Sequence, residues 1–327
     1  MALTACAASA ASKGLAIDPA VEPPTFSALT RLLVVAPHPD DETLATGLLI
    51  QQVRAAGGEV QILLLTAGDN NPWPQRWLER RIRIRGVDRQ RWGQRRLAEM
   101  QHALRQLDVP AQALRTLGWP DMGITEGLLQ SGSGLLATLA EAIGEFHPSL
   151  IALPSLHDRH PDHGTAHVLV RLAVARLARS PAMLAYLVHG RTLGVRYVEI
   201  CGSAGQQACK QQALSAYRSQ MALSRNRLRR LAALPERYAL VPPRPGQPAS
   251  ALPWLPPAWL QPWLRLSVVS ERGTQSWRWR DAPLRRDGEG IYQLTLTSGL
   301  DDIPCFVRLA WDLHALWIFD HWGWHEL

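Results

Sequence analysis

Apolar residues in the first two thirds of the chain fall into short runs, and longer amphipathic stretches separate these runs. The runs are short and continuous enough to be buried strands, at residues 31–36, 59–66, 113–117, 149–154 and 183–189. The stretches between them are expected to be helices, at 43–56, 96–107, 134–146 and 165–179. Strand, helix and strand in close succession form a right-handed parallel unit by default. The alternation therefore predicts an α/β fold with a Rossmann-like, doubly wound, mainly parallel sheet.

The pattern changes after about residue 240. Residues 196–200 are expected to extend the sheet, and 209–234 to form one long amphipathic helix. Prolines then crowd a predicted linker at 241–262. Beyond it, alternating segments that carry most of the tryptophans predict a small Trp-rich β appendage over 263–327 that docks on the main domain, with strands at 264–270, 276–280, 291–297, 305–311 and 315–319. The main domain is placed at 29–240, after a loose leader at 1–28.

Composition marks a globular protein, with 46% hydrophobic and 19% charged residues among 327. The net charge of +7 suits an anionic substrate, a membrane surface or nucleic acid, although ordinary solubility explains it as well. No helix-turn-helix, zinc-finger or RNA-binding pattern is recognised, so no nucleic-acid partner is expected. Nine arginines lie between residues 76 and 96, close to Trp73, Trp77 and Trp92. They form either a phosphate- or membrane-facing flap or, more simply, a solvated helical surface.

Four cysteines are present, none in CxxC spacing, which argues against a cysteine zinc site or a redox pair. No run approaches the roughly 18 apolar residues of a membrane span. The N-terminal residues lack a basic start and make a poor secretory signal. A reduced, cytoplasmic protein is the simplest expectation.

Acidic residues and histidines cluster directly after two of the predicted strands. Pro37-His38-Pro39-Asp40-Asp41-Glu42 follows the first strand, and a segment ending in His160-Pro161-Asp162-His163 follows the fourth. Histidine nitrogen and aspartate oxygen are ligands suited to zinc. A tight turn that opens a helix can aim His38 and Asp41 at one point, which leaves Asp40 free to handle a proton. The simpler alternative is that Asp41 or Glu42 only caps the helix.

Sheet order decides between these alternatives. In a 3-2-1-4-5 arrangement the first and fourth strands are neighbours, so both loops face one crevice at the point where the strand order reverses. Two distant clusters are thus predicted to meet, which favours a metal site. His189, at the end of the fifth strand, could reach the edge of that crevice, but a strand-end histidine is more often structural.

These segments resemble the PIG-L/LmbE family of zinc-dependent N-acetylglucosamine-type deacetylases. The resemblance covers roughly residues 30–225 and rests on four matching pieces, 37–42, Arg96-Leu97-Ala98-Glu99, Trp119-Pro120-Asp121 and 160–163. It implies that the zinc ligands are His38, Asp41 and His163. It implies that Asp40 is the general base and that His160 assists the tetrahedral intermediate and protonates the leaving amine.

The resemblance further implies that Arg96 and Asp121 line the sugar site, and Asp162 is expected to orient one of the histidines. His157 and Asp158 are expected to be rim residues without a role at the metal. Two histidines and one carboxylate could hold Fe²⁺ as well as Zn²⁺.

The expected activity is hydrolysis of the acetamide of an N-acetylated amino sugar, which releases acetate and a free amine. The arginine cluster makes a phosphate-, nucleotide- or lipid-linked sugar a reasonable hypothesis. One alternative is an amidase acting on a larger acyl or thiol-sugar conjugate. Another is a non-catalytic glycan-binding protein that uses its exposed tryptophans. The exact sugar and the oligomeric state are not specified by the sequence.

Overall fold

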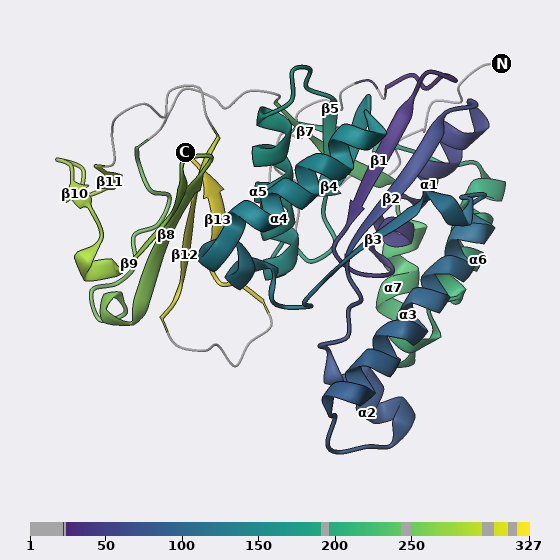
Figure 1. Ribbon diagram of the computed structural model, residues 1–327, viewed down its shortest axis with the longest axis horizontal. Helices are drawn as coiled ribbons and strands as arrows, with labels where there is room; N and C mark the ends of the chain where they lie inside the picture. Colours follow the sequence, from purple (N-terminus) through teal and green to yellow (C-terminus); the bar gives the residue numbers. More distant parts are fainter. Residues whose placement is uncertain (1–21, 23, 191–195, 243–249, 296–303, 313–318) are drawn as a thin grey trace, which may run out of the picture.

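The computed structural model describes residues 22, 24–190, 196–242, 250–295, 304–312 and 319–327. At its centre lies a seven-stranded sheet in the order β3-β2-β1-β4-β5-β7-β6 (Figure 1). Its strands are β1 (Arg31–Ala36), β2 (Glu59–Thr66), β3 (Leu114–Trp119), β4 (Leu150–Pro154), β5 (Ala182–Tyr186), β6 (Tyr197–Ile200) and β7 (Glu236–Val241). The first five pair in parallel in the predicted order. The doubly wound, mainly parallel fold is therefore confirmed.

Helices cover both faces of this sheet. On one face lie α1 (Asp41–Ala55), α3 (Gly86–Gln106), α6 (Ala204–Ser215) and α7 (Arg218–Ala233), and on the other α4 (Ile124–Phe146) and α5 (Pro161–Ala175). Successive residues of β1 point into opposite cores. Val34 packs in the core beneath α1, α3, α6 and α7, and Val35 packs in the core beneath α4 and α5. Burial on both faces explains why the parallel strands read as continuous apolar runs.

The far edge of the sheet differs from the prediction. Residues 209–234 form two helices, not one, because the chain turns at Tyr217, whose hydroxyl donates to the buried carboxylate of Glu42. The strand β7 was not predicted, and it pairs antiparallel with both β5 and β6. Its first residue, Glu236, is a buried charge paired with Lys210 (Nζ–Oε1 2.6 Å), and such a charge hides the strand from an apolar pattern.

Two further helical features bear on the site. Helix α4 begins ten residues earlier than predicted, and Ser131 within it has non-helical dihedrals. Helix α2 (Pro72–Glu79) and the first turns of α3 extend away from the body of the molecule (Figure 1). Residues 72–91 are called the arm below. Short 3₁₀ turns lie at Ala111–Ala113, Gln261–Trp263 and Trp279–Asp281.

The C-terminal part is rich in antiparallel strands, as predicted. Its larger sheet has the order β13-β12-β8-β9 and contains β8 (Leu264–Ser270), β9 (Gly273–Arg278), β12 (Cys305–Trp311) and β13 (Gly323–Glu326). A two-stranded sheet joins β10 (Leu284–Arg286) to β11 (Tyr292–Leu294). The predicted strand at 315–319 lies mostly outside the described residues.

This C-terminal sheet packs directly on the main domain. Phe306 and Trp324 share a buried core with α4 and α5, and the indole Nε1 of Trp324 donates to Thr165 Oγ1 at 3.0 Å. The sheet therefore supports the helix that carries His163. The limits proposed for the leader, domain and linker stay predictions. No helix in the described part of the chain has the length and apolarity needed to cross a bilayer.

Candidate metal centre and active site

The two His-Pro-Asp segments meet at the carboxyl ends of β1 and β4, which are neighbours in the sheet. The first segment turns into α1 through Asp40, whose φ of 113° is unusual for a residue with a side chain. The second turns into α5, where Pro161 occupies the first helical turn and His160 caps the helix. A non-glycine residue held at positive φ is a strain that functional sites often retain.

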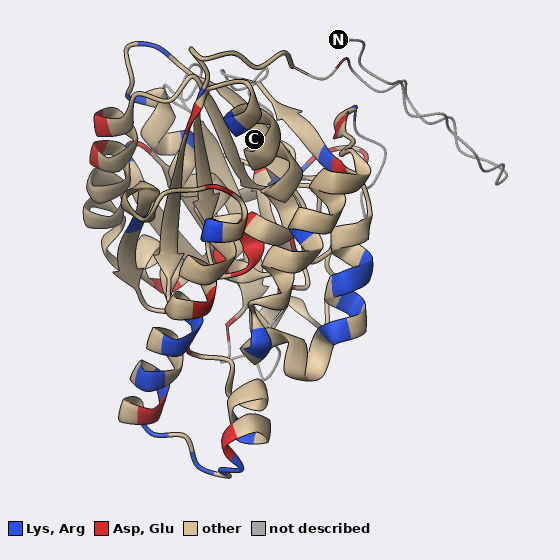
Figure 2. Ribbon diagram, turned by 90° about the vertical axis from the view of Figure 1, so that its right-hand side faces the viewer, with Lys and Arg blue, Asp and Glu red and all other residues tan. Residues whose placement is uncertain are grey.

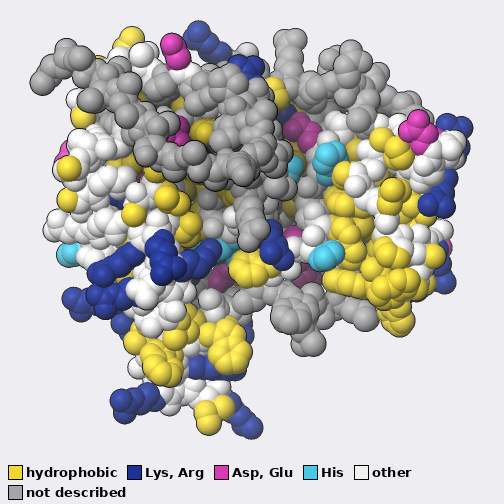
Figure 3. Space-filling view, turned by 180° about the vertical axis from the view of Figure 1, so that it is seen from behind, with side chains coloured by type: hydrophobic (Ala, Val, Ile, Leu, Met, Phe, Trp, Pro, Cys, Tyr) yellow, Lys and Arg dark blue, Asp and Glu magenta, His cyan; other side chains and the backbone are white. Residues whose placement is uncertain are grey.

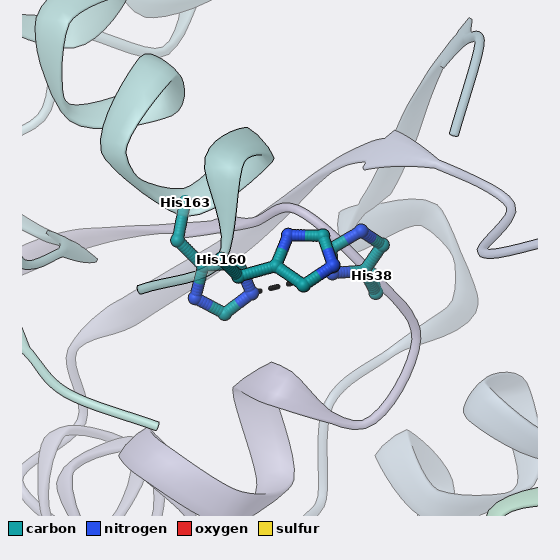
Figure 4. Close-up of side chains that lie close together, drawn as sticks. All are labelled: His38, His160 and His163. Carbon is teal, nitrogen blue, oxygen red and sulfur yellow. Dashed lines mark hydrogen bonds between the residues drawn. The ribbon is translucent and has the colours of Figure 1, made fainter. Parts of the chain in front are cut away.

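Three side-chain atoms from these segments form a nearly equilateral triangle. His38 Nδ1 lies 3.2 Å from His163 Nε2 and 3.4 Å from Asp41 Oδ2, and His163 Nε2 lies 3.2 Å from Asp41 Oδ2. Figure 4 shows the rings of His38 and His163 turned toward each other. Ligands of a tetrahedral zinc ion at about 2.0–2.1 Å lie about 3.3–3.4 Å apart. The donor set and its spacing therefore fit a divalent ion.

Each histidine of this triangle presents its other ring nitrogen to carboxylates. His38 Nε2 lies 3.2 Å from Asp121 Oδ1 and 3.4 Å from Asp162 Oδ2, and His163 Nδ1 lies 3.1 Å from Asp158 Oδ2. Carboxylates in this position fix the ring orientation and the tautomer of a metal-bound histidine. Asp162 thus contacts a histidine as expected.

Asp158 lies elsewhere than the sequence suggested, and Asp121 is also buried. Asp158, expected at the rim, is buried beneath His163, and its carboxylate also accepts from the backbone N–H groups of His160, Val188 and His189. Asp121, expected to contact the sugar, accepts from the Asn70 N–H at 2.6 Å and is 8% exposed. Both carboxylates face protein donors.

The electrostatics of the cluster favour a positive charge. Burial alone would lower the pKa of His38, yet hydrogen bonds to Asp121, Asp162 and Asp41 raise it well above its usual value. Burial likewise opposes the charge on His163, but Asp41 and Asp158 outweigh it and raise the pKa to about 10. The carboxylates that stabilise protons on His38 and His163 in the metal-free protein supply enough negative charge to stabilise a divalent cation instead of those protons.

Other ligand combinations lie close by. His38, His160 and His163 form one group whose possible ligand atoms lie within 4.8 Å of one another, and Asp41, His163 and His189 form a second. A third consists of His38, Asp121 and Asp162. The triangle of His38, Asp41 and His163 is preferred here because each ring then keeps a carboxylate behind it.

Asp40 stands beside this triangle and is 8% exposed. Burial raises its pKa to about 7, the nearby charge of Arg96 opposes that shift, and Asp41 and Glu42 reinforce it. Its Oδ1 lies 3.6 Å from the Arg96 guanidinium. Its backbone N–H donates to Glu42 Oε2 at 3.1 Å, so Glu42 does act as a cap. A carboxylate with a pKa near 7 suits proton transfer at neutral pH.

Arg96, expected to touch the sugar, is buried and bonded to the protein. Its guanidinium donates to the carbonyl oxygens of Gly68 and Pro39, both at 2.6 Å. Gly68 has φ +61°, and a Cβ there would lie 1.8 Å from the guanidinium. Arg96 therefore ties the loops after β1 and β2 together behind Asp40.

His160 lies against His38 with ring centroids 4.5 Å apart (Figure 4). Its Nδ1 accepts from the Asp162 backbone N–H at 3.3 Å, which places the proton of the neutral ring on Nε2. Burial holds its pKa well below the usual value, and positive charge on His38 and His163 lowers it further. The neutral ring can donate one hydrogen bond from Nε2.

A residue from the C-terminal part borders the same site. Phe319 lies 6.3 Å from the ring of His160 and 5.5 Å from that of His189, measured between centroids. The next residue, Asp320, donates its N–H to the Arg159 carbonyl at 2.8 Å. No sequence pattern indicates that Phe319 borders the site, because it lies more than 150 residues beyond His160. His189, which the sequence favoured as a structural residue, lies beside His160 and Phe319 at the site.

Comparison with known proteins bears on the same residues. Residues 33–174 match the sequence model of the PIG-L family, described as GlcNAc-PI de-N-acetylase. The chain is 32% identical over 164 residues to a 1D-myo-inositol 2-acetamido-2-deoxy-alpha-D-glucopyranoside deacetylase of Mycolicibacterium vanbaalenii, covering 44% of this chain and 54% of that protein. It is 31% identical over 177 residues to the protein of that name from Mycobacteroides abscessus, covering 48% and 60%. The chain thus spans between half and two thirds of these relatives.

Solved structures share the fold. An N,N'-diacetylchitobiose deacetylase from Pyrococcus horikoshii superposes with a TM-score of 0.52 at 18% identity, covering 65% of this chain and 84% of that one. A deacetylase of the teicoplanin biosynthetic pathway also gives 0.52, at 21% identity, and covers 65% and 98%. Both His-Pro-Asp segments lie within the stretch that the family model matches, and residues 33–174 are a domain of the PIG-L family.

Proposed function

We propose that this protein is a metal-dependent deacetylase that hydrolyses the acetamide of an N-acetylated amino sugar. The observation that carries the proposal is the triangle of His38, Asp41 and His163, with the buried carboxylate of Asp40 beside it. The relatives are named as deacetylases of a 2-acetamido sugar, which supports the proposed substrate class.

His38, Asp41 and His163 would hold a divalent ion, which when bound would polarise the amide carbonyl and lower the pKa of water toward neutrality. Asp40 accepts a proton from this water as the water attacks the carbonyl carbon. The C–N bond then breaks, and Asp40 returns the proton to the leaving amine, so that acetate and a free amine are formed. Arg96 holds the loop of Asp40 in place through Pro39 and Gly68.

His160 donates a hydrogen bond from Nε2–H to the oxygen that becomes negative in the transition state. Its Nδ1 is occupied by the Asp162 N–H, so the ring is already oriented for that donation. Donors aimed at a developing oxyanion typically contribute about 10²–10³ in rate. Protonation of the amine, which the resemblance assigned to His160, falls instead to Asp40 in this proposal, because Asp40 already carries the proton that it accepted from water.

Zinc is the proposed metal, and Fe²⁺ is the second candidate. Two imidazoles and one carboxylate with a further position for water are typical of catalytic zinc. The same set with open positions also suits Fe²⁺. Reconstitution of the metal-free protein with each ion in turn, without oxygen for Fe²⁺, distinguishes the two.

Two alternatives predict different products. An amidase for a larger acyl or thiol-sugar conjugate would release an amine only from those conjugates. A non-catalytic glycan-binding protein would use exposed tryptophans such as Trp259 and Trp263, which are 74% and 52% exposed. The presence of both Asp40 and His160 at the site favours catalysis. A phosphate-, nucleotide- or lipid-linked sugar remains part of the proposal because of the arginines at 76–96.

The test is release of free amine from a panel of N-acetylglucosamine compounds and their inositol, nucleotide and lipid conjugates. Chelation should abolish turnover, and Zn²⁺ or Fe²⁺ should restore it. Asp40→Asn should lower kcat by about 10² or more while the bound metal is unchanged. Asp281→Asn, at a side chain 59% exposed in the C-terminal part, is the matched control. Full turnover by the chelated protein or by Asp40→Asn would refute the proposal.

A further inference from the structure

The arm is a folded hairpin that projects beyond the central sheet (Figures 1 and 2). The buried side chain of Gln75 in α2 donates to the backbone carbonyl of Asp88 in α3 at 2.7 Å. Asp88 accepts from Arg81 and Arg91, and Glu79 also accepts from Arg91 at 2.6 Å. These contacts hold the two helices together and use both acidic residues of the arm.

The charge of the arm is therefore largely uncompensated. Between residues 72 and 91 there are seven arginines and two acidic residues, a net charge of +5 in a chain whose total is +7. Arg80, Arg83 and Arg85 are exposed, and none of them pairs with a carboxylate in the described part of the chain. Figure 2 shows basic residues along both sides of the arm.

Large apolar side chains share this surface with the arginines. Ile82 is 88% exposed, Val87 69%, Trp77 67% and Trp73 61%. Figure 3 shows hydrophobic and cationic side chains together on the projecting part. Two hollows combine the types, one lined by residues that include Arg81, Ile82, Arg83, Arg85 and Val87, the other by Arg76, Trp77, Leu78 and Arg80. Burial of such side chains against an apolar phase is favourable.

The root of the arm joins the site. The loop that precedes α2 contains Asn70, whose N–H donates to Asp121 at 2.6 Å. The helix α3 that returns from the tip contains Arg96, which lies beside Asp40. Two short segments therefore connect the tip of the arm, and any surface that the tip binds, to the metal centre.

We propose that the arm binds the surface of an anionic lipid bilayer, with Trp73, Trp77, Ile82 and Val87 entering the interface and the arginines contacting lipid phosphates. Tryptophan is favoured at the membrane interface, and basic residues flanking an apolar face are typical of peripheral membrane attachment. A nucleic acid would match the arginines but would not require an isoleucine as exposed as Ile82. An acidic protein partner would account for both the arginines and the exposed isoleucine, so the experiment must distinguish such a partner from a bilayer.

The experiment measures co-sedimentation of the full chain with vesicles of phosphatidylcholine, with and without phosphatidylglycerol. Binding is expected only to the anionic vesicles and should weaken as salt increases. Each arginine near an anionic surface contributes roughly fivefold to partitioning, so Arg80→Gln with Arg83→Gln should weaken binding about 30-fold. Arg285→Gln with Arg286→Gln, two exposed arginines of β10, should leave binding within about twofold of the unaltered chain.

A second variant tests the apolar contribution without changing the charge. Ile82→Ser with Val87→Ser should also weaken binding, whereas Leu255→Ser, 60% exposed in the C-terminal part, should not. Thermal melting checks that each variant is folded. Turnover of an uncharged, water-soluble N-acetyl sugar, without a phosphate, nucleotide or lipid group, should be unchanged in the arm variants, which separates this proposal from the catalytic one. Absence of vesicle binding at low salt, equal binding by arm and control variants, or an arm that only mediates self-association in sedimentation velocity would each overturn the proposal.

Discussion

Replacement of Asp158 by asparagine tests whether the buried acid behind His163 serves the metal. One carboxylate oxygen accepts from His163 Nδ1 and from the N–H groups of Val188 and His189, and the other accepts from the N–H of His160. An amide keeps only one acceptor. If its oxygen serves the first three donors, its NH₂ group faces the His160 N–H, and an unsatisfied buried donor costs about 1–3 kcal/mol of unfolding free energy.

The same change removes the negative charge that orients His163 and strengthens it as a ligand. Loss of such a partner typically weakens metal binding about 10- to 100-fold. Competition against a chelator of known affinity measures the metal dissociation constant, and urea unfolding of the metal-free protein measures the structural cost separately. Asp281→Asn is the control. Metal affinity within about twofold of the unaltered protein, together with lowered stability, would show that Asp158 is structural alone.

Three further predictions follow from the site. Because Asp40 must be ionised to accept a proton and burial raises its pKa to about 7, kcat/KM should fall as pH decreases through a limb at or somewhat below pH 7, since a bound cation lowers this pKa; pH-rate profiles of the metal-loaded protein measure it. The pKa of His163 is raised to about 10, so the metal-free protein binds this proton more tightly when folded. The resulting stability is fully present below about pH 6.5 and is lost as pH rises toward 10, and melting temperatures with and without metal should diverge over that range. Phe319→Ala should raise KM for the sugar severalfold with a smaller effect on kcat, because Phe319 forms a wall beside His160 and His189; equal KM values would exclude this contact.

The central fold could be predicted because its signals are local and redundant. The apolar runs at β1, β2 and β4 are buried on both faces. The helices between them are long enough to be distinguished from strands in the sequence by their length. The edge of the sheet formed by β7 and β6 lacks such redundant local signals. The strand β7 carries Glu236, a charge whose burial depends on Lys210 from α6, and no pattern within β7 reveals such a distant partner.

The meeting of the two His-Pro-Asp segments could also be anticipated, since motif and topology agree. His38 and Asp41 share one turn, and the pairing of β1 with β4 brings His163 to them. Two of the three supporting acids, Asp121 and Asp158, could not be placed in the same way. The loop that contains Asp158 also contains other residues that could act at the site. Whether the Asp158 side chain points outward or beneath His163 depends on the backbone N–H donors of residues 188 and 189.

The metal centre therefore joins two kinds of information. The ligands come from two loops whose sequence states their chemistry directly, while the carboxylates that orient the rings come from three places, Asp121 after β3, Asp162 in α5 and Asp158 before it. A change in Asp121 or Asp158 would leave both His-Pro-Asp segments recognisable and is nevertheless expected to alter metal affinity. Asp121 also accepts from the N–H of Asn70, so the carboxylate that contacts His38 is held by the loop that follows β2.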